Sequence, residues 1–505
     1  MLSVTVNAGL WAVVLLGLVS YVFLRPLQSA RRVPNAHWSS GLSPLWILWT
    51  RYRNRELAVL EDKHRQLGPI VRLGPADLSI SCYENGARTI YNGGFEKPEY
   101  YSFFSYYAHK NAFCSLTRQD HSLRRKRITA AYTKSAVFTS EPLSSLTQTV
   151  LLARLLPILE HQASSNEPTD VLALSYALSL DLLTGFQFGL SSASDFLQTP
   201  ASLGPWIRHY EQRYCKAAFW PQELPTLTRC LKAVGVDMLP ASQRRSTRFL
   251  EDWLLDMCER AERAAERGLT QDTPVVYRLV KRGVEADMPG ASEDTRKREI
   301  ASELFDQMSG GREVLGLVLA YTIFYISQNP SAQARLRAEL ASLEPGMRHS
   351  DTAARLPSPS SLEELPYLSA VLKESFRMRP TSTPLPRVTP RDRPVSLAGV
   401  DGIPPGTRVN VFQWLIHRNP DNYSRADEWR PERWLTGPSP LLWPFGGGSR
   451  MCVGIAVTQY LMRYILAMLY SNFSSSVVSK RTGAHEPGSS EDEIMVQFQR
   501  VSESS

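Results

Sequence analysis

The chain has 505 residues, of which 43% are hydrophobic and 10% aromatic, a composition that excludes an intrinsically disordered protein. Its formal net charge of +8 suits an anionic membrane surface, an acidic protein partner or nucleic acid, and does not choose among them. The densest basic run is Arg124 to Arg127, but no zinc-finger spacing or RNA-binding aromatic motif accompanies it, so we expect no nucleic-acid partner. The six cysteines contain no CxxC pair and are too sparse for a disulfide scaffold, which predicts a reduced, cytosol-facing domain.

The first predicted element is a membrane anchor at residues 4–24, a stretch without any charged residue. About 20 apolar residues are enough for a helix to cross a membrane. Arg25, Arg31 and Arg32 follow at once, and this positive flank should stay in the cytoplasm. A cleavable signal peptide is the alternative, but such a peptide carries its charge before the apolar stretch. We therefore expect a single-pass anchor, a Pro- and Arg-bearing linker at residues 25–50, and no second apolar span of this length.

Helical periodicity dominates the remainder of the chain. Residues 71–81 alternate and contain β-branched side chains, which predicts one or two short strands. An aromatic-rich run at residues 100–113 is either core or the wall of an apolar pocket. Helices are expected at residues 146–156, 172–188, 247–267, 296–327 and 331–343, and strand-like pieces at 395–411. The pattern predicts one mainly α-helical domain with a small β region over residues 51–480, followed by a flexible tail at 481–505.

The most specific motif is the loop from Phe445 to Gly454, which reads FGGGSRMCVG. It resembles, position for position, the FxxGxRxCxG haem-binding loop of cytochromes P450, with Cys452 as the axial ligand of haem b. A thiolate ligand pushes electron density onto haem iron and favours O–O cleavage. Glycines such as Gly448 and Gly454 let the backbone approach a flat macrocycle, and exposed N–H groups can bond to the sulfur. Arg450 is placed to meet a haem propionate.

Two simpler interpretations of this loop are weaker. An inert buried thiol in a glycine-rich turn would not require five fixed positions at the family's spacing. A phosphate-binding loop is excluded because no GK[ST] follows the glycines.

Two further segments, Lys373–Arg377 and Trp429–Trp434, follow the cytochrome P450 pattern. The resemblance implies that Glu374, Arg377 and Arg433 form a buried cluster. Buried charges are tolerated only when they are paired and hydrogen-bonded. We therefore expect a structural role for this cluster and no part in catalysis.

The resemblance also implies partners for the haem propionates. Residues 121–125 resemble the family's WxxxR helix, with His121 in place of the tryptophan. Arg125 would then face a propionate, with His121 as a further candidate. Arg387 matches the third propionate partner. The alternative for each is an ordinary solvated side chain.

One departure from the family pattern lies in the predicted helix at 296–327. Residues 310–314, Gly-Gly-Arg-Glu-Val, align with the oxygen-activation motif (A/G)Gx(D/E)T. The glycines permit a local opening of the helix. Glu313 supplies the acid, although a helix-face carboxylate paired with a nearby arginine is the alternative. Val314 replaces the threonine that helps to deliver protons, and valine has no hydroxyl to relay one.

Three hypotheses follow from this replacement. A substrate hydroxyl or a held water replaces the threonine and monooxygenation proceeds, which we favour. Alternatively, the enzyme oxidises without inserting oxygen, by desaturation, ring closure or coupling. In the third hypothesis, it rearranges an already oxygenated substrate and needs no reductase.

The resemblance covers nearly the whole chain and is strongest to fungal microsomal cytochromes P450. It implies a helix-rich fold with haem between two central helices, in an enzyme of the endoplasmic reticulum membrane with a cytosolic catalytic domain. It further implies NADPH as the electron source through a cytochrome P450 reductase docked on the basic surface near Arg125. The expected substrate is a hydrophobic small molecule of secondary metabolism, and a haem-thiolate sensor is the non-enzyme alternative. The candidate substrate-pocket residues are Tyr107, Phe305, Ser309, Gly310, Thr383 and Leu385.

Overall fold

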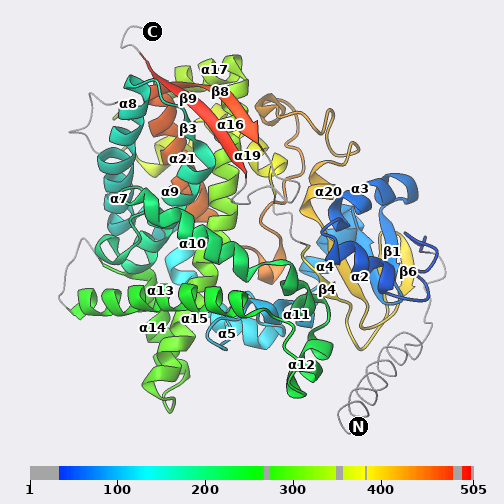
Figure 1. Cartoon of the computed structure of the whole chain (residues 1–505). Helices are drawn as coiled ribbons and strands as arrows, with labels where there is room; N and C mark the ends of the chain where they lie inside the picture. Colours follow the sequence, from blue (N-terminus) through cyan, green and yellow to red (C-terminus); the bar gives the residue numbers. More distant parts are fainter. Residues whose placement is uncertain (1–32, 267–272, 349–355, 381–383, 482–491, 502–505) are drawn as a thin grey trace. The chain divides into compact units, whose positions relative to one another are not determined.

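Two compact units are visible in the computed structural model, which describes residues 33–266, 273–348, 356–380, 384–481 and 492–501 (Figure 1). The smaller unit takes its described residues from Met1–Tyr100, Ser382–Ile416 and Gly447–Arg450, and the larger unit takes the rest. The sequence predicted one domain. The chain crosses between the two units several times, so local composition does not mark their boundary, and one domain over residues 51–480 stays a prediction. The anchor predicted at residues 4–24 lies outside the described residues.

The smaller unit contains a four-stranded sheet of order β1-β2-β7-β4. Its strands are β1 (Ile70–Gly74), β2 (Asp77–Ile80), β7 (Arg408–Val411) and β4 (Arg387–Val388). The β2–β7 pair is parallel, and the other two pairs are antiparallel. This confirms the two short strands expected at residues 71–81. The unit also contains α2 (Leu45–Tyr52), α3 (Glu56–Leu67), the π-helix η1 (Tyr83–Ala87), α4 (Arg88–Asn92), and a hairpin of β5 (Val395–Leu397) and β6 (Val400–Ile403). The helix α20 (Gln413–His417) follows β7, and the 3-10 turn η9 (Gly448–Arg450) also belongs to this unit.

The linker predicted at residues 25–50 is wrong from residue 33 onward. The backbone there continues the free edge of β1, since Arg72 donates to Pro34 O at 2.8 Å and Ala36 donates to Arg72 O at 2.9 Å. Val33, Ala36 and Ile47 are buried. Prolines at this edge are compatible with pairing because only some backbone groups face the neighbouring strand.

The larger unit is mainly helical, which confirms the predicted fold class. Its helices in the first half are α5 (Arg118–Tyr132), α6 (Lys134–Phe138), α7 (Glu141–Gln148), α8 (Leu156–Ser164), α9 (Val171–Phe188), α10 (Pro200–Arg213), α11 (Phe219–Glu223), α12 (Pro225–Ala233) and α13 (Ala241–Glu266). Those in the second half are α14 (Val275–Asp287), α15 (Glu293–Gly311), α16 (Leu317–Gln328), α17 (Pro330–Leu340), α18 (Pro359–Glu363), α19 (Pro366–Met378) and α21 (Ile455–Asn472). Its short turns of helix are η2 (Glu99–Phe104), η3 (Thr149–Leu155), η4 (Leu190–Ser192), η5 (Lys216–Ala218) and η8 (Pro431–Trp434). The five helices expected from periodicity are all present, with shifted ends.

Two helical stretches of the larger unit, Glu141–Ser164 and Val171–Phe188, are long and apolar enough to cross a membrane by length and composition. The sequence predicts no such span beyond the anchor. In α9 the reason for the apolar run is burial, because 89% of it lies inside the protein. A helix that is apolar all round is typical of a protein core as well as of a membrane.

The flexible tail predicted at residues 481–505 is wrong for residues 493–500, which form a strand. Residues Glu493–Arg500 form β9, which pairs with β8 (Phe473–Arg481) and with β3 (Thr169–Asp170). Ile494, Val496 and Phe498 alternate with more exposed residues and are buried. A period of two with one buried face is enough to specify a strand.

The helix expected at residues 296–327 is interrupted by one π-helical turn, η6 (Arg312–Gly316), between α15 and α16. A Cβ atom on Gly311 would lie 2.4 Å from Leu183 Cδ1, and one on Gly316 would lie 2.7 Å from Tyr176 Cδ1. A side chain at either position would force Leu183 or Tyr176 of α9 to move, so these glycines let α9 pack closely against the helix here. The predicted local opening of this helix is present at the aligned motif.

Candidate active site

The loop that carries Cys452 is closed by its own backbone. The Cys452 N–H donates to Phe445 O at 2.9 Å, and the Phe445 ring packs edge-on against Phe376 of α19, with centroids 5.0 Å apart. Part of the Cys452 residue is exposed, although its sulfur is closely surrounded by the protein. Desolvation by the surrounding loop raises the pKa of its thiol, whereas the Gly454 N–H and the Arg125 guanidinium favour the thiolate. The loop therefore presents a sulfur with a hydrogen-bond donor and a cation to stabilise its anion.

Gly448 begins the 3-10 turn η9 in the smaller unit and has a positive φ of 63°. A Cβ atom there would lie 2.3 Å from the carbonyl oxygen of Tyr91. Only glycine accommodates both this φ and this approach. Arg450 ends η9 and is half-buried.

The predicted propionate partners lie in different units. In the larger unit, Arg125 of α5 donates from Nη1 to Met451 O at 2.9 Å, which joins α5 to the residue before Cys452. His121, one turn earlier on α5, is buried. In the smaller unit, the buried Arg387 guanidinium lies over the Tyr91 ring, 4.6 Å from its centroid. Their contacts with a propionate remain predictions.

The residues around the loop fit a haem group better than a chelated metal ion. Gly310 is exposed near the end of α15, whose residues from Glu299 to Ser309 are mostly buried, and a Cβ atom on it would meet nothing within 4 Å. Open space therefore borders α15 at this level. Among the described residues, no cluster of three His, Cys, Asp or Glu side chains could hold a metal ion. A single thiol is the protein donor that a haem-thiolate site requires.

Glu313 lies in the π-helical turn, and its side chain is 51% exposed. Its Oε1 accepts from Arg312 Nη1 at 2.7 Å. The pairing with Arg312 and the exposure to solvent match the alternative given for Glu313, a helix-face carboxylate beside an arginine, and its role as the acid of the motif stays a prediction. Val314 is partly buried and packs against the hydrophobic core.

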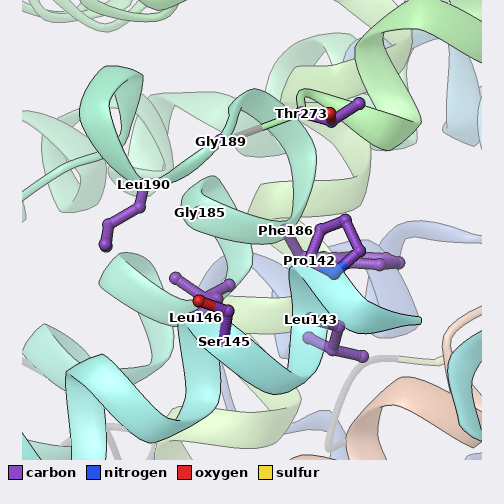
Figure 2. A pocket seen from close by; sticks show the side chains of 9 residues that line it. All are labelled: Pro142, Leu143, Ser145, Leu146, Gly185, Phe186, Gly189, Leu190 and Thr273. Carbon is purple, nitrogen blue, oxygen red and sulfur yellow. The ribbon is translucent and has the colours of Figure 1, made fainter. Parts of the chain in front are cut away.

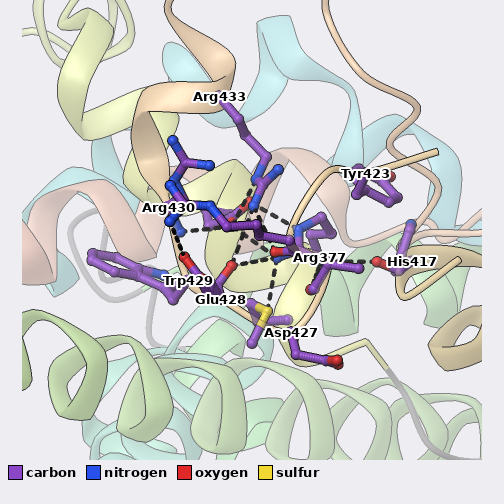
Figure 3. A network of polar contacts seen from close by, with 12 residues as sticks. Arg377, His417, Tyr423, Asp427, Glu428, Trp429, Arg430 and Arg433 are labelled. Atoms are coloured by element: carbon purple, nitrogen blue, oxygen red, sulfur yellow. Dashed lines mark hydrogen bonds and ion pairs between the residues drawn. The ribbon is translucent and has the colours of Figure 1, made fainter. Parts of the chain in front are cut away.

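The structure brings Glu374, Arg377 and Arg433 together, and Figure 3 shows the two arginines in their network of polar contacts. Arg377 donates to both Glu374 oxygens at 2.9 and 2.8 Å, and Arg433 Nε donates to Oε1 at 3.0 Å. Glu374 also accepts from the Arg430 backbone and the Trp434 indole. Glu374 and Arg377 are fully buried, so these bonds satisfy charges that would otherwise be costly.

The Arg377 guanidinium also donates to backbone carbonyl oxygens. Its Nη1 donates to His417 O at 2.8 Å and Ala426 O at 2.6 Å, and its Nη2 donates to Glu428 O at 2.9 Å. The cluster thus fixes the segment before the Cys452 loop to α19, which is a structural role.

The candidate substrate-pocket residues do not share one environment. Phe305 is 0% exposed and stacks on Tyr106, with centroids 4.0 Å apart, so it is core in this structure. Tyr107 is also buried. Its N–H donates to Glu251 Oε1 and its hydroxyl donates to Glu251 O, both at 2.6 Å. Ser309 bonds to Tyr210. The sequence could not predict these contacts because their partners lie far away along the chain.

The other candidates differ again. Gly310 borders the open space described above, and Leu385 is half-buried in the smaller unit, where its carbonyl accepts from the Tyr91 hydroxyl at 2.6 Å. Thr383 lies outside the described residues.

A small cavity lies between α7 and α9, where Leu146, Gly185 and Phe186 line it (Figure 2). Its volume of about 20 Å³ suits a single water molecule. It is too small for a haem or an organic substrate.

Two charged side chains, the basic Arg312 and the acidic Glu303, are not predicted from the sequence as part of the site. Arg312 occupies the unspecified position of the motif, and Glu303 lies buried on α15, where no local pattern distinguishes it. An arginine inside an otherwise apolar and glycine-rich helical segment is an unusual choice and was the available signal.

A helix-rich fold, a central helix opened beside glycines, and one partly exposed cysteine in a closed glycine-rich loop together define a protein of the haem-thiolate class. The chain belongs to the cytochrome P450 family, whose family model, "Cytochrome P450", matches residues 44–497. The family implies a haem-thiolate cofactor and monooxygenase activity.

Several curated fungal proteins are similar over most of their length. The cytochrome P450 monooxygenase oblB of Emericella variicolor is 26% identical over 92% of this chain and 84% of its own. The cytochrome P450 monooxygenase gsfF of Penicillium aethiopicum is 24% identical over 95% of each chain. The fusicoccadiene C-8 hydroxylase of Alternaria brassicicola is 26% identical over 85% of this chain and 81% of its own.

Proposed function

We propose that this cytochrome P450 inserts oxygen into a hydrophobic small molecule of fungal secondary metabolism, by hydroxylation, epoxidation or multi-step oxidation. The observation that carries the proposal is the partly exposed Cys452 in its closed loop, beside Arg125. The named relatives are monooxygenases, and one of them is a hydroxylase of fusicoccadiene. Gly310 leaves room for a substrate beside α15, because a Cβ atom on it would meet nothing within 4 Å.

When bound, haem would supply the activation of dioxygen, and the Cys452 thiolate would hold its iron. The protein's own part begins at this sulfur, where the Gly454 N–H and Arg125 stabilise negative charge. Glu313 can take a proton from solvent and release it beside the π-helical turn, because half of its side chain is exposed. We further propose that His121, Arg125, Arg387 and Arg450 hold the propionates.

We propose NADPH as the electron source, through a cytochrome P450 reductase that binds a basic surface near Arg125. The net charge of +8 supports attraction to an acidic partner. Residues 4–24 are proposed to anchor the protein in the endoplasmic reticulum membrane, with the catalytic domain in the cytosol. Deleting residues 1–24 should then move the expressed protein from the membrane fraction to the soluble fraction.

Replacing the proposed ligand tests the assignment. The purified protein should show the carbonyl spectrum of a haem-thiolate protein after reduction, and Cys452→Ser should lose it. Cys258→Ser is the matched control, because that cysteine is buried away from the loop in α13 and should leave the spectrum unchanged. Retention of the spectrum in Cys452→Ser would show that another group ligates the iron.

Oxidation without oxygen insertion is the second candidate function, and Val314 favours it because the side chain has no hydroxyl for proton relay. Turnover under labelled dioxygen distinguishes the two. Label in the product supports monooxygenation, and a product free of label supports desaturation, ring closure, coupling or rearrangement.

A further inference from the structure

Arg312 is a buried cation in the π-helical turn η6, only 2% exposed. Its guanidinium lies over two aromatic rings, 4.0 Å from the centroid of Tyr176 on α9 and 4.6 Å from that of Tyr210 on α10. Stacking on both rings favours a fixed orientation of the guanidinium plane and compensates part of its lost hydration.

The Arg312 side chain binds the residue that follows it. Its Nη1 donates to Glu313 Oε1 at 2.7 Å. Consecutive residues of a regular α-helix do not face each other. The π-helical turn interrupts the regular register here, and the long arginine side chain spans the remaining distance. One partner is thus buried in the protein, whereas the other is half-exposed.

The remaining N–H groups of Arg312 make this pair unusually dependent on Glu313. Among the described residues, Nε and Nη2 are buried and find no hydrogen-bond acceptor. Loss of the Glu313 carboxylate would therefore leave a buried cation without its ion-pair partner, which is strongly unfavourable. The two side chains should hold each other in place.

Tyr210 fixes this arrangement from α10. Its hydroxyl bonds to Ser309 Oγ of α15 at 2.6 Å, one turn before Glu313, while its ring covers Arg312. Burial raises the pKa of the Tyr210 hydroxyl, so that it remains protonated and able to donate. The Arg312 guanidinium is therefore held from two helices and from its own turn.

We propose that Arg312 is a positioning residue, which holds one oxygen of the Glu313 carboxylate so that the other delivers protons at the turn where Val314 lacks a hydroxyl. This inference rests on the proposed function. In each cycle Glu313 releases one proton from its carboxyl group and regains one from solvent, so that it ends unchanged. Without Arg312 the carboxylate would rotate freely on an exposed side chain, and misplacement by about 1 Å can lower a rate roughly a hundredfold.

The experiment uses the full-length, haem-loaded protein with carbon monoxide as a probe. The infrared stretch of the bound gas reports the local electric field and its heterogeneity. The variants are Arg312→Gln, Glu313→Gln, the double variant and Arg312→Lys, which keeps the charge if Arg312→Gln binds haem poorly. Arg298→Gln is the matched control, because Arg298 pairs with Asp294 on the same helix at 2.8 Å but is exposed. Hydrogen peroxide released per NADPH, with a fungal reductase, is the second readout.

We expect Arg312→Gln and Glu313→Gln to shift or broaden the carbonyl band alike, and the double variant to add nothing further. Arg312→Lys should fall between them and the wild type, and Arg298→Gln should match the wild type. Peroxide release should rise roughly tenfold in both single variants. An unchanged band in Arg312→Gln, or additive shifts in the double variant, would overturn the inference. Absence of a carbonyl band in the wild type would instead overturn the proposed function itself.

Discussion

Replacing Glu303 by glutamine should make the stability of the protein less dependent on pH. Glu303 lies on α15 and is only 1% exposed. Its Oε2 accepts from the Ala112 N–H at 2.9 Å, and its Oε1 accepts from Gln307 Nε2 at 3.4 Å. Burial raises the pKa of its carboxyl group from 4.5 to about 7, although these hydrogen bonds and the nearby Arg124 and Arg127 oppose the shift.

The sign of the effect follows from which state binds the proton more tightly. Between pH 4.5 and about 7 the folded protein holds a proton on Glu303 that the unfolded chain has released. Stability from this group is therefore fully present below pH 4.5 and is lost as pH rises to about 7. The pKa difference corresponds to roughly 3 kcal/mol of unfolding free energy.

Glu303→Gln keeps the shape and removes the ionisation. We expect the variant to be more stable than the wild type by up to about 3 kcal/mol at pH 8, and similar to it or about 1 kcal/mol less stable at pH 5. Urea unfolding followed by circular dichroism at pH 5 to 8.5 measures this. Glu293→Gln, an exposed substitution at the start of the same helix, is the control and should retain the wild-type profile. If Glu303→Gln also retained that profile, the reasoning about its burial would be refuted.

Three further predictions concern the site and its support. Glu374→Gln should cost roughly 3–5 kcal/mol of stability in the same unfolding assay, because it leaves the fully buried Arg377 without its carboxylate. Gly448→Ala should lower the ratio of haem absorbance to protein absorbance, because the new Cβ atom would lie 2.3 Å from a carbonyl oxygen. Gly437→Ala is its control and should bind haem normally, because Gly437 also has a positive φ but a Cβ atom there would meet nothing within 4 Å. Val314→Thr should change the peroxide released per NADPH only slightly if another group already supplies the relay, and a large fall would show that the missing hydroxyl limits coupling.

The parts of the site that sequence could predict are those whose members are neighbours along the chain. The Cys452 loop is a contiguous segment, and Glu374 and Arg377 are separated by three residues on one helix. The stacking of Arg312 on Tyr176 and Tyr210 instead joins η6 to α9 and α10, whose residues lie more than a hundred positions away along the chain. No local period reveals such a contact, because side-chain stacking depends on how the helices pack.

The errors at the two ends of the chain had a different cause. The predicted linker at residues 25–50 and the predicted tail at residues 481–505 rest on composition, because prolines and arginines punctuate the first segment and Ser and Glu are frequent in the second. The alternation of Ile494, Val496 and Phe498 was present in the sequence and predicts a strand. Pairing at a sheet edge needs only a short alternating run, and composition averaged over the tail conceals it.

The three glutamates at 299, 303 and 313 show how position along one helical segment separates chemical roles. Glu299 is buried and bonded to Arg124 at 2.8 Å and Arg127 at 3.0 Å, so its charge is neutralised within the protein. Glu303 is equally buried, and no ion pair to it is found among the described residues, which makes its ionised form costly. Only Glu313 is both paired and open to solvent, and only this combination keeps a carboxylate oriented while it exchanges protons. Carbodiimide labelling in the folded protein should therefore modify Glu313 and spare Glu299 and Glu303, and labelling of all three at equal rates would contradict this separation.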